Sequence, residues 1–152
     1  MRAYIGLGGN LGDREATLRA ALELLAAEPG VVVGAVSSFT ETEPWGYADQ
    51  PWFLNAVCAV ETELGPRDLL ARLLAVERRL GRSRGDGPRF GPRSIDLDLL
   101  VHGELTVSEP GLEVPHPRLA ERRFVLSPLA EIAPDLVVPG HGRVADLLAG
   151  VQ

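Results

Sequence analysis

Residues 94–101 constrain the fold most, because apolar residues and carboxylates alternate along them. Ile95, Leu97 and Leu99 occupy one set of alternate positions, and Asp96 and Asp98 occupy the other. Successive side chains of a β-strand point to opposite faces, so this segment predicts a strand with one apolar face and one acidic face. The two aspartate Cα atoms are expected about 6–7 Å apart. Carboxylates that close repel each other unless positive charge lies between them.

The rest of the chain supplies the partners of this strand. The other strands are expected at residues 2–7, 31–40 and 53–62, where apolar residues recur at alternate positions or the residues are β-branched. One helix is expected after an N-cap at Asp13, ending before Pro29, and a second from Pro66 onward. Long loops are expected at 43–52 and 81–92. The order strand–helix–strand–strand–helix–strand predicts an α+β, ferredoxin-like βαββαβ fold, with a mostly antiparallel sheet and both helices on one face.

Weaker patterns follow this core and predict a C-terminal extension. They indicate an edge strand at 104–107, helical turns at 119–130, a short strand at 136–138 and a helix at 144–148. The 152 residues suit one domain, residues 1–152. There is no apolar run of membrane-spanning length, no signal-peptide pattern at the start, and one cysteine, Cys58. We expect a cytoplasmic monomer without a membrane segment.

The basic residues are concentrated in one part of an acidic chain. All 15 are arginine, the net charge is −6, and six arginines fall between positions 78 and 93. An acidic protein with one arginine cluster is a poor general nucleic-acid binder, so no nucleic-acid partner is expected. Guanidinium groups match phosphate oxygens bidentately, which favours one compact anionic ligand. A solvated surface patch is the alternative, above all for Arg78 and Arg79.

The strand at 53–62 predicts a second functional face. Its apolar alternate residues should pack under the helices, which leaves Phe53 and Asn55 on the opposite face with Asp96 and Asp98. An aromatic ring beside an amide suits a flat heterocycle. Alternatively, Asn55 caps loop backbone and Phe53 fills a gap. The aspartate pair favours Mg²⁺ over simple ion pairs with nearby arginines, because unbound carboxylates on an apolar strand are costly to desolvate.

Other candidates are less specific. Glu77 is expected at the edge of the second helix, where it could bind a ligand or hold an arginine. Gly6 and Gly8 do not continue into the dinucleotide-binding glycine motif, because Leu11 occupies the position of its third glycine. Without lysine, the chain has no phosphate-binding P-loop either. His116 could donate a hydrogen bond to phosphate or stabilise its own turn.

Several motifs occur in a fixed order along nearly the whole chain. They are YIGLGGNLG at 4–12, DQP at 49–51, FLNA at 53–56, Glu77 with GRSR at 81–84, GPRSIDLD at 91–98, VPHP at 114–117 and PLAEIAP at 128–134. In this order and spacing they resemble the 6-hydroxymethyl-7,8-dihydropterin pyrophosphokinase family. Some positions differ from many relatives, including Phe90, where a tryptophan is common.

The resemblance implies an enzyme that transfers pyrophosphate from ATP to the pterin hydroxymethyl group and releases AMP, in folate biosynthesis. It implies Asp96 and Asp98 as ligands of two Mg²⁺ ions and, with Arg82 and Arg93, as catalytic residues. The implied ATP-binding residues are Glu77, Arg82, Arg84, Arg93, Leu99, His116 and Arg122. The implied pterin-binding residues are Thr42, Glu43, Trp45, Phe53, Asn55, Phe90 and Phe124. A non-catalytic ferredoxin-like binding module and a metal-dependent phosphohydrolase remain the alternatives.

Overall fold

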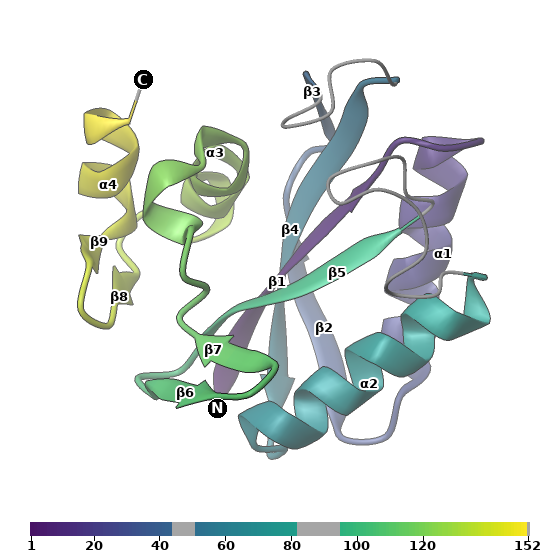
Figure 1. Cartoon of the computed structure of the whole chain (residues 1–152), viewed down its shortest axis with the longest axis horizontal. Helices are drawn as coiled ribbons and strands as arrows, with labels where there is room; N and C mark the ends of the chain where they lie inside the picture. The colour runs from purple at the N-terminus through teal and green to yellow at the C-terminus, as the bar shows by residue number, and fades with distance from the viewer. Residues whose placement is uncertain (44–50, 82–94, 152) are drawn as a thin grey trace.

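A five-stranded antiparallel sheet forms the centre of the molecule. The computed structural model describes residues 1–43, 51–81 and 95–151. The strands of this sheet are β1 (Arg2–Gly9), β2 (Val31–Val36), β3 (Thr40–Thr42), β4 (Phe53–Thr62) and β5 (Asp96–His102). Their order is β2-β4-β1-β5, with β3 paired to the other end of β4 (Figure 1). This is the order that the split βαβ arrangement predicts, so the expected fold class is confirmed.

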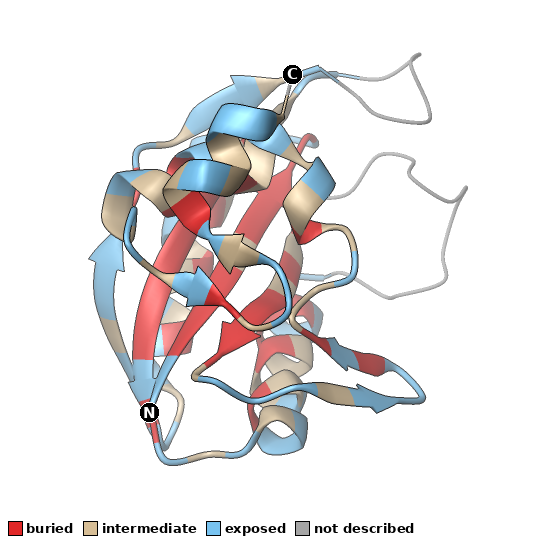
Figure 2. Cartoon of the chain, turned by 90° about the vertical axis from the view of Figure 1, so that its left-hand side faces the viewer, coloured by how far each residue is buried: buried red, intermediate tan, exposed pale blue. Residues whose placement is uncertain are grey.

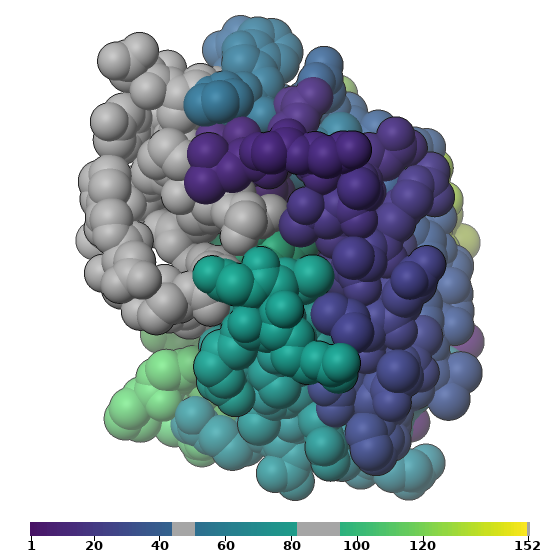
Figure 3. Space-filling model, turned by 90° about the vertical axis from the view of Figure 1, so that its right-hand side faces the viewer, coloured from purple at the N-terminus to yellow at the C-terminus, as the bar shows by residue number. Residues whose placement is uncertain are grey.

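Two helices cover one face of the sheet, as the sequence predicts. They are α1 (Arg14–Ala27) and α2 (Pro66–Arg79), and they lie side by side in Figure 3. Asp13 caps α1 by accepting a hydrogen bond from the backbone N–H of Ala16 at 3.1 Å. Alternate residues of the strands pack against the helices, among them Ile5, Cys58 and Leu97, which are fully buried. This core fixes which strand residues point the other way.

The C-terminal part of the chain covers the opposite face, which the sequence did not predict. A 3-10 turn (Leu119–Glu121) leads into α3 (Arg123–Ile132), and α4 (Val144–Gly150) follows. Leu126, Leu129 and Val144 form a second core with buried residues from β4 and β5. Figure 2 views the molecule from this side, with the C-terminal helices in front of strands that are largely buried. The backbone N–H of Ser38 also donates to Glu131 of α3 at 3.0 Å. The sheet is therefore enclosed between two helical layers along part of its length.

Two short hairpins complete the described structure. They are β6 (Val107–Glu109) with β7 (Leu112–Val114), and β8 (Val137–Val138) with β9 (Gly142–Arg143). The edge strand expected at 104–107 is therefore displaced to β6, where it pairs with β7 and not with the central sheet. Within the described residues, no helix is both long and apolar enough to cross a membrane.

The strand expected at 31–40 is in fact two strands. The pairing of β2 with β4 shifts register between Val33 and Val36, which is the irregularity of a β-bulge. Ser37 then exchanges hydrogen bonds with Val57, through its backbone N–H and its hydroxyl, before β3 begins. β-branched composition predicts extended backbone, but it does not show where a register shift divides a strand.

Candidate active site

A pocket of about 260 Å³ opens on the sheet face opposite α1 and α2, and backbone forms its floor. In the register of the sheet, Gly8 lies between Asn55 of β4 and Asp96 of β5. Gly6 lies between Val57 and Asp98 in the same way. Because both central positions lack side chains, the neighbouring strands can present polar groups across an open floor. The sequence signal for this floor is the Gly-x-Gly spacing on an alternating strand, which was interpreted only against the dinucleotide-binding glycine motif.

Gly8 is required by close approach rather than by backbone conformation. A Cβ at this position would lie 2.7 Å from Oδ1 of Asn55, which is closer than real Cβ contacts. A Cβ on Gly6 would meet the side chain of Leu100 at 3.5 Å, an ordinary van der Waals distance. Gly8 therefore creates the space that the Asn55 amide occupies.

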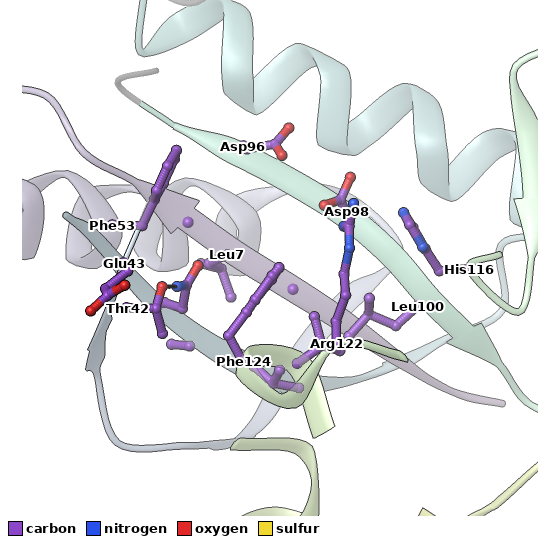
Figure 4. A pocket seen from close by; sticks show the side chains of 16 residues that line it. Leu7, Thr42, Glu43, Phe53, Asp96, Asp98, Leu100, His116, Arg122 and Phe124 are labelled. Carbon is purple, nitrogen blue, oxygen red and sulfur yellow. Dashed lines mark hydrogen bonds between the residues drawn. The ribbon is translucent and has the colours of Figure 1, made fainter. Parts of the chain in front are cut away.

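An amide and two aromatic rings form one part of the pocket. Asn55 donates a hydrogen bond from Nδ2 to Oγ1 of Thr42, its diagonal neighbour across the β3–β4 ladder, so its amide is held in place. Phe53 precedes it by two residues on the same face of β4, and Phe124 enters from the first turn of α3 (Figure 4). Apolar rings around an amide that can donate and accept suit a small planar heterocycle.

Charged groups form the other part. Asp96 and Asp98 project from β5 into the pocket, and Arg122 points toward Asp98 from the start of α3 (Figure 4). The Arg122 guanidinium also lies over the Phe124 ring, 5.4 Å from its centre. Burial lowers the pKa of Arg122, and the nearby Asp98 carboxylate opposes that change. A guanidinium beside paired carboxylates provides both signs of charge at the place where a phosphate chain would meet metal ions.

His116 is held as a neutral hydrogen-bond donor at the same end. Its backbone N–H donates to the carbonyl of Leu100 on β5 at 2.8 Å, which fixes it against the sheet. Its Nδ1 accepts from the backbone N–H of Arg118 at 3.1 Å, so in the neutral ring the proton resides on Nε2. Burial, with the positive charges of Arg122 and Arg118, lowers the pKa of His116 to about 4. The imidazole can therefore donate to an anion at pH 7 without carrying charge.

The donor set at β5 fits magnesium. The described residues contain no group of three or more His, Cys, Asp or Glu side chains arranged around a common point. Mg²⁺ does not need such a group, because it usually takes one or two carboxylates and completes its shell with water and phosphate oxygens. Two carboxylates on alternate positions of one strand, facing an open pocket, meet that requirement.

The structure brings most of the predicted residues together. Those that line the pocket are Thr42, Glu43, Phe53, Asn55, Asp96, Asp98, His116, Arg122 and Phe124. Trp45, Arg82, Arg84, Phe90 and Arg93 lie outside the described residues, as do most of the two long loops that the sequence predicts.

Two predicted ATP-binding residues lie elsewhere. Glu77 is 1% exposed beneath the sheet and accepts a hydrogen bond from the backbone N–H of Leu97 at 2.7 Å. The Leu99 side chain belongs to the core on the helical side of β5. Neither side chain lines the pocket, and Glu77 holds the strand that carries the two aspartates. Helical spacing placed Glu77 at an edge, but it did not show how closely β5 packs on α2.

Comparison with known proteins identifies the family. The family model of 7,8-dihydro-6-hydroxymethylpterin-pyrophosphokinase (HPPK) matches residues 4–134. A 2-amino-4-hydroxy-6-hydroxymethyldihydropteridine pyrophosphokinase of Methylorubrum extorquens is 53% identical over 140 residues, covering 92% of this chain and 87% of that protein. The protein of the same name from Bacillus subtilis is 49% identical over 130 residues, covering 86% of this chain and 77% of that protein.

A solved structure supports the same fold. The crystal structure of Plasmodium falciparum HPPK-DHPS with pteroate superposes with a TM-score of 0.75 at 14% identity, over 98% of this chain and 42% of that one. At this identity the match bears on the fold alone. The family model and the sequence relatives show the family, and the fold is consistent with it. The chain belongs to the 7,8-dihydro-6-hydroxymethylpterin-pyrophosphokinase family.

Proposed function

We propose that this protein transfers the β,γ-diphosphate of ATP to the hydroxymethyl oxygen of 6-hydroxymethyl-7,8-dihydropterin, giving AMP and the pterin diphosphate for folate biosynthesis. The observation that carries the proposal is the division of one pocket into an aromatic amide part and a charged part. In this proposal residues 1–152 form one cytoplasmic, monomeric pyrophosphokinase domain. Its partners are the two small substrates, without nucleic acid or membrane.

The pterin is assigned to the aromatic part. Phe53 and Phe124 would contact the faces of its ring, and Asn55, held by Thr42, would bind the polar edge. The cavity of about 260 Å³ is smaller than the ~300–1,000 Å³ of sites for drug-sized ligands. The cavity therefore suits the pterin, the smaller of the two substrates, and the nucleotide would extend beyond the cavity. Further contacts to the pterin would come from Glu43, Trp45 and Phe90.

The phosphate chain is assigned to the charged part. Asp96 and Asp98 would hold two Mg²⁺ ions, which supply neutralisation of charge on the phosphate oxygens when bound. Arg122 would pair with phosphate oxygens, and His116 would donate from Nε2 as a neutral group. We also assign phosphate binding to Arg82, Arg84 and Arg93. The nucleotide site would further include Glu77 and Leu99.

Phosphoryl transfer depends mainly on positioning the reactants and stabilising spread negative charge, and little on covalent chemistry by the protein. The pocket provides both requirements. The aromatic part would orient the hydroxymethyl group toward β5, where the aspartates, Arg122 and His116 would surround the site of transfer; all four line the pocket. No step in this proposal requires a nucleophilic side chain.

Product identity tests the proposal. The purified protein is incubated with ATP and Mg²⁺, with and without the hydroxymethyl-dihydropterin, and AMP and phosphate are separated by chromatography. We expect AMP and pterin diphosphate only when the pterin is present. Phosphate release without the pterin would indicate a phosphohydrolase, and binding of both substrates without turnover would indicate a binding module. Either result would overturn the proposal.

The metal assignment is tested separately with Asp96→Asn and Asp98→Asn. Each should reduce turnover by more than about 100-fold, since loss of even an outer-shell partner of a metal site costs 10–100-fold. Asp135→Asn is the matched control, because Asp135 pairs with Arg143 at 2.7 Å on the exposed surface near α4. Circular dichroism should show all three variants folded. Near-normal turnover in either strand variant would exclude the assigned metal role.

A further inference from the structure

Arg14 lies outside the pocket, yet it joins the two strands that carry the aromatic part. It is the first residue of α1, and its side chain is 28% exposed. Nη1 donates to the backbone carbonyl of Trp52 at 2.8 Å, and Nη2 forms an ion pair with the Glu41 carboxylate. A planar guanidinium can hold two acceptors in fixed relative positions, whereas a lysine ammonium cannot do so with the same geometry.

Both partners of Arg14 immediately precede residues that line the pocket. Glu41 precedes Thr42 on β3, and Trp52 precedes Phe53 on β4. Thr42 and Phe53 are direct partners in the β3–β4 ladder. Since side chains alternate along a strand, Glu41 points away from the pocket toward α1 while Thr42 faces it. The start of α1, β3 and the start of β4 lie at the same end of the sheet (Figure 1).

The β3–β4 pairing has little stability of its own. β3 has three residues, and in the described structure it pairs only with β4. A short ladder at a sheet edge is marginally stable without further contacts. The hydrogen bond from Asn55 to Thr42 depends on this ladder, because Thr42 must remain opposite Phe53.

We propose that Arg14 is a positioning residue for the aromatic part of the pocket. By holding Glu41 and the Trp52 carbonyl together, it fixes the spacing between Thr42 and the Phe53 ring. The ion pair is partly exposed, with Glu41 at 55%, so its contribution to global stability is small. Its effect is on local geometry, and it concerns binding of the heterocycle and not of the phosphates. This inference rests on the proposed function, which assigns the pterin to this part.

The experiment compares Arg14→Met with Arg67→Met as the matched control. Arg67 occupies the first turn of α2 and likewise binds one carboxylate, of Glu109, and one backbone carbonyl, of Pro110, but it lies away from the pocket. Steady-state kinetics give KM for each substrate and kcat, and thermal unfolding gives Tm. We expect Arg14→Met to raise KM for the pterin about tenfold, as misplacement of a binding group by part of an ångström can do. KM for ATP should change less than about twofold.

Further variants keep the test decisive. Glu41→Gln removes the same ion pair without altering α1, so it should raise the pterin KM in the same direction. The two substitutions should be non-additive when combined, because both remove the ion pair between Arg14 and Glu41. Arg14→Lys should restore only part of the affinity, since it keeps the charge and loses the fork.

Three results would overturn the inference while leaving the proposed function intact. They are an unchanged pterin KM in Arg14→Met, a parallel rise in KM for both substrates, or the same changes in Arg67→Met. All three require a wild-type protein that forms AMP when the pterin is present. Absence of that activity would instead count against the proposed function.

Discussion

Replacing Gly8 with alanine should disturb the pocket floor by a distance that the structure specifies. The new Cβ would lie 2.7 Å from Oδ1 of Asn55, about 0.7 Å inside the 3.4 Å at which ordinary contact begins. The backbone of Gly8 is not in the left-handed region, so the substitution adds no conformational strain. The least costly response is rotation of Asn55, which breaks its hydrogen bond to Thr42.

The expected energies separate binding from stability. Loss of the Asn55–Thr42 hydrogen bond costs about 0.5–1.5 kcal/mol of folding stability. The lower entropy of the unfolded chain that alanine brings offsets about 0.4–1 kcal/mol of this. A displaced amide that no longer pairs with the heterocycle weakens binding by a further ~1–3 kcal/mol, which is roughly 5- to 150-fold.

Isothermal titration with the pterin and urea unfolding measure the two effects. Gly6→Ala is the matched control, because its Cβ would meet Leu100 at 3.5 Å and should be accommodated. In the Asn55→Ala background, Gly8→Ala should cost almost nothing further, since the clashing atom is absent. Equal losses of affinity in Gly8→Ala and Gly6→Ala, or full additivity with Asn55→Ala, would refute this account.

Three other predictions concern His116, Glu77 and Cys58. Because the pKa of His116 is about 4 in the folded protein and near 6.5 unfolded, protonation favours unfolding, so stability should fall between pH 6.5 and 4, by about 2 kcal/mol at pH 5 relative to His116→Gln. Urea unfolding of both proteins at pH 7 and pH 5 measures this, and parallel pH profiles would contradict it. Glu77→Leu removes the acceptor 2.7 Å from the Leu97 N–H and should cost about 1–3 kcal/mol, whereas Glu77→Gln should cost less, so equal Tm losses would argue against the bond. Burial raises the pKa of Cys58 to about 12, so iodoacetamide at pH 8 should modify it only after unfolding, and rapid labelling of the folded protein, detected by mass spectrometry, would disprove this.

The acidic strand shows how much of the site follows from sequence. Alternation alone placed Asp96 and Asp98 on one face with Phe53 and Asn55, and the structure brings all four to one pocket. Alternation is sufficient here because successive residues of a strand point to opposite faces of the sheet. When α1 and α2 pack on one face, the alternate residues that do not contact them all share the other face. The fold class followed from the same periodicity.

Other features depend on how elements distant in sequence pack together, and the periodicity of one segment does not give that packing. The position of Glu77 under β5 results from close packing between α2 and the strand, which its place on the helix could not give. The floor formed by Gly6 and Gly8 depends on register between three strands that are distant in sequence. The second helical layer was not predicted, because the patterns at 119–130 and 144–148 indicate helical structure but not the sheet face that α3 and α4 cover.

The central place of β1 also has a consequence for synthesis of the protein. β1 is synthesised before β4 and β5, so it has no partner in the central sheet until residues 53–62 follow, and its second edge remains unpaired until residues 96–102 follow. Arg122 and Phe124 emerge later still. Pairings between such distant segments form slowly, and unpaired strand edges are prone to aggregation in the meantime. Nascent chains that end before Phe124 should therefore depend most on chaperones, and they cannot contain a complete pocket.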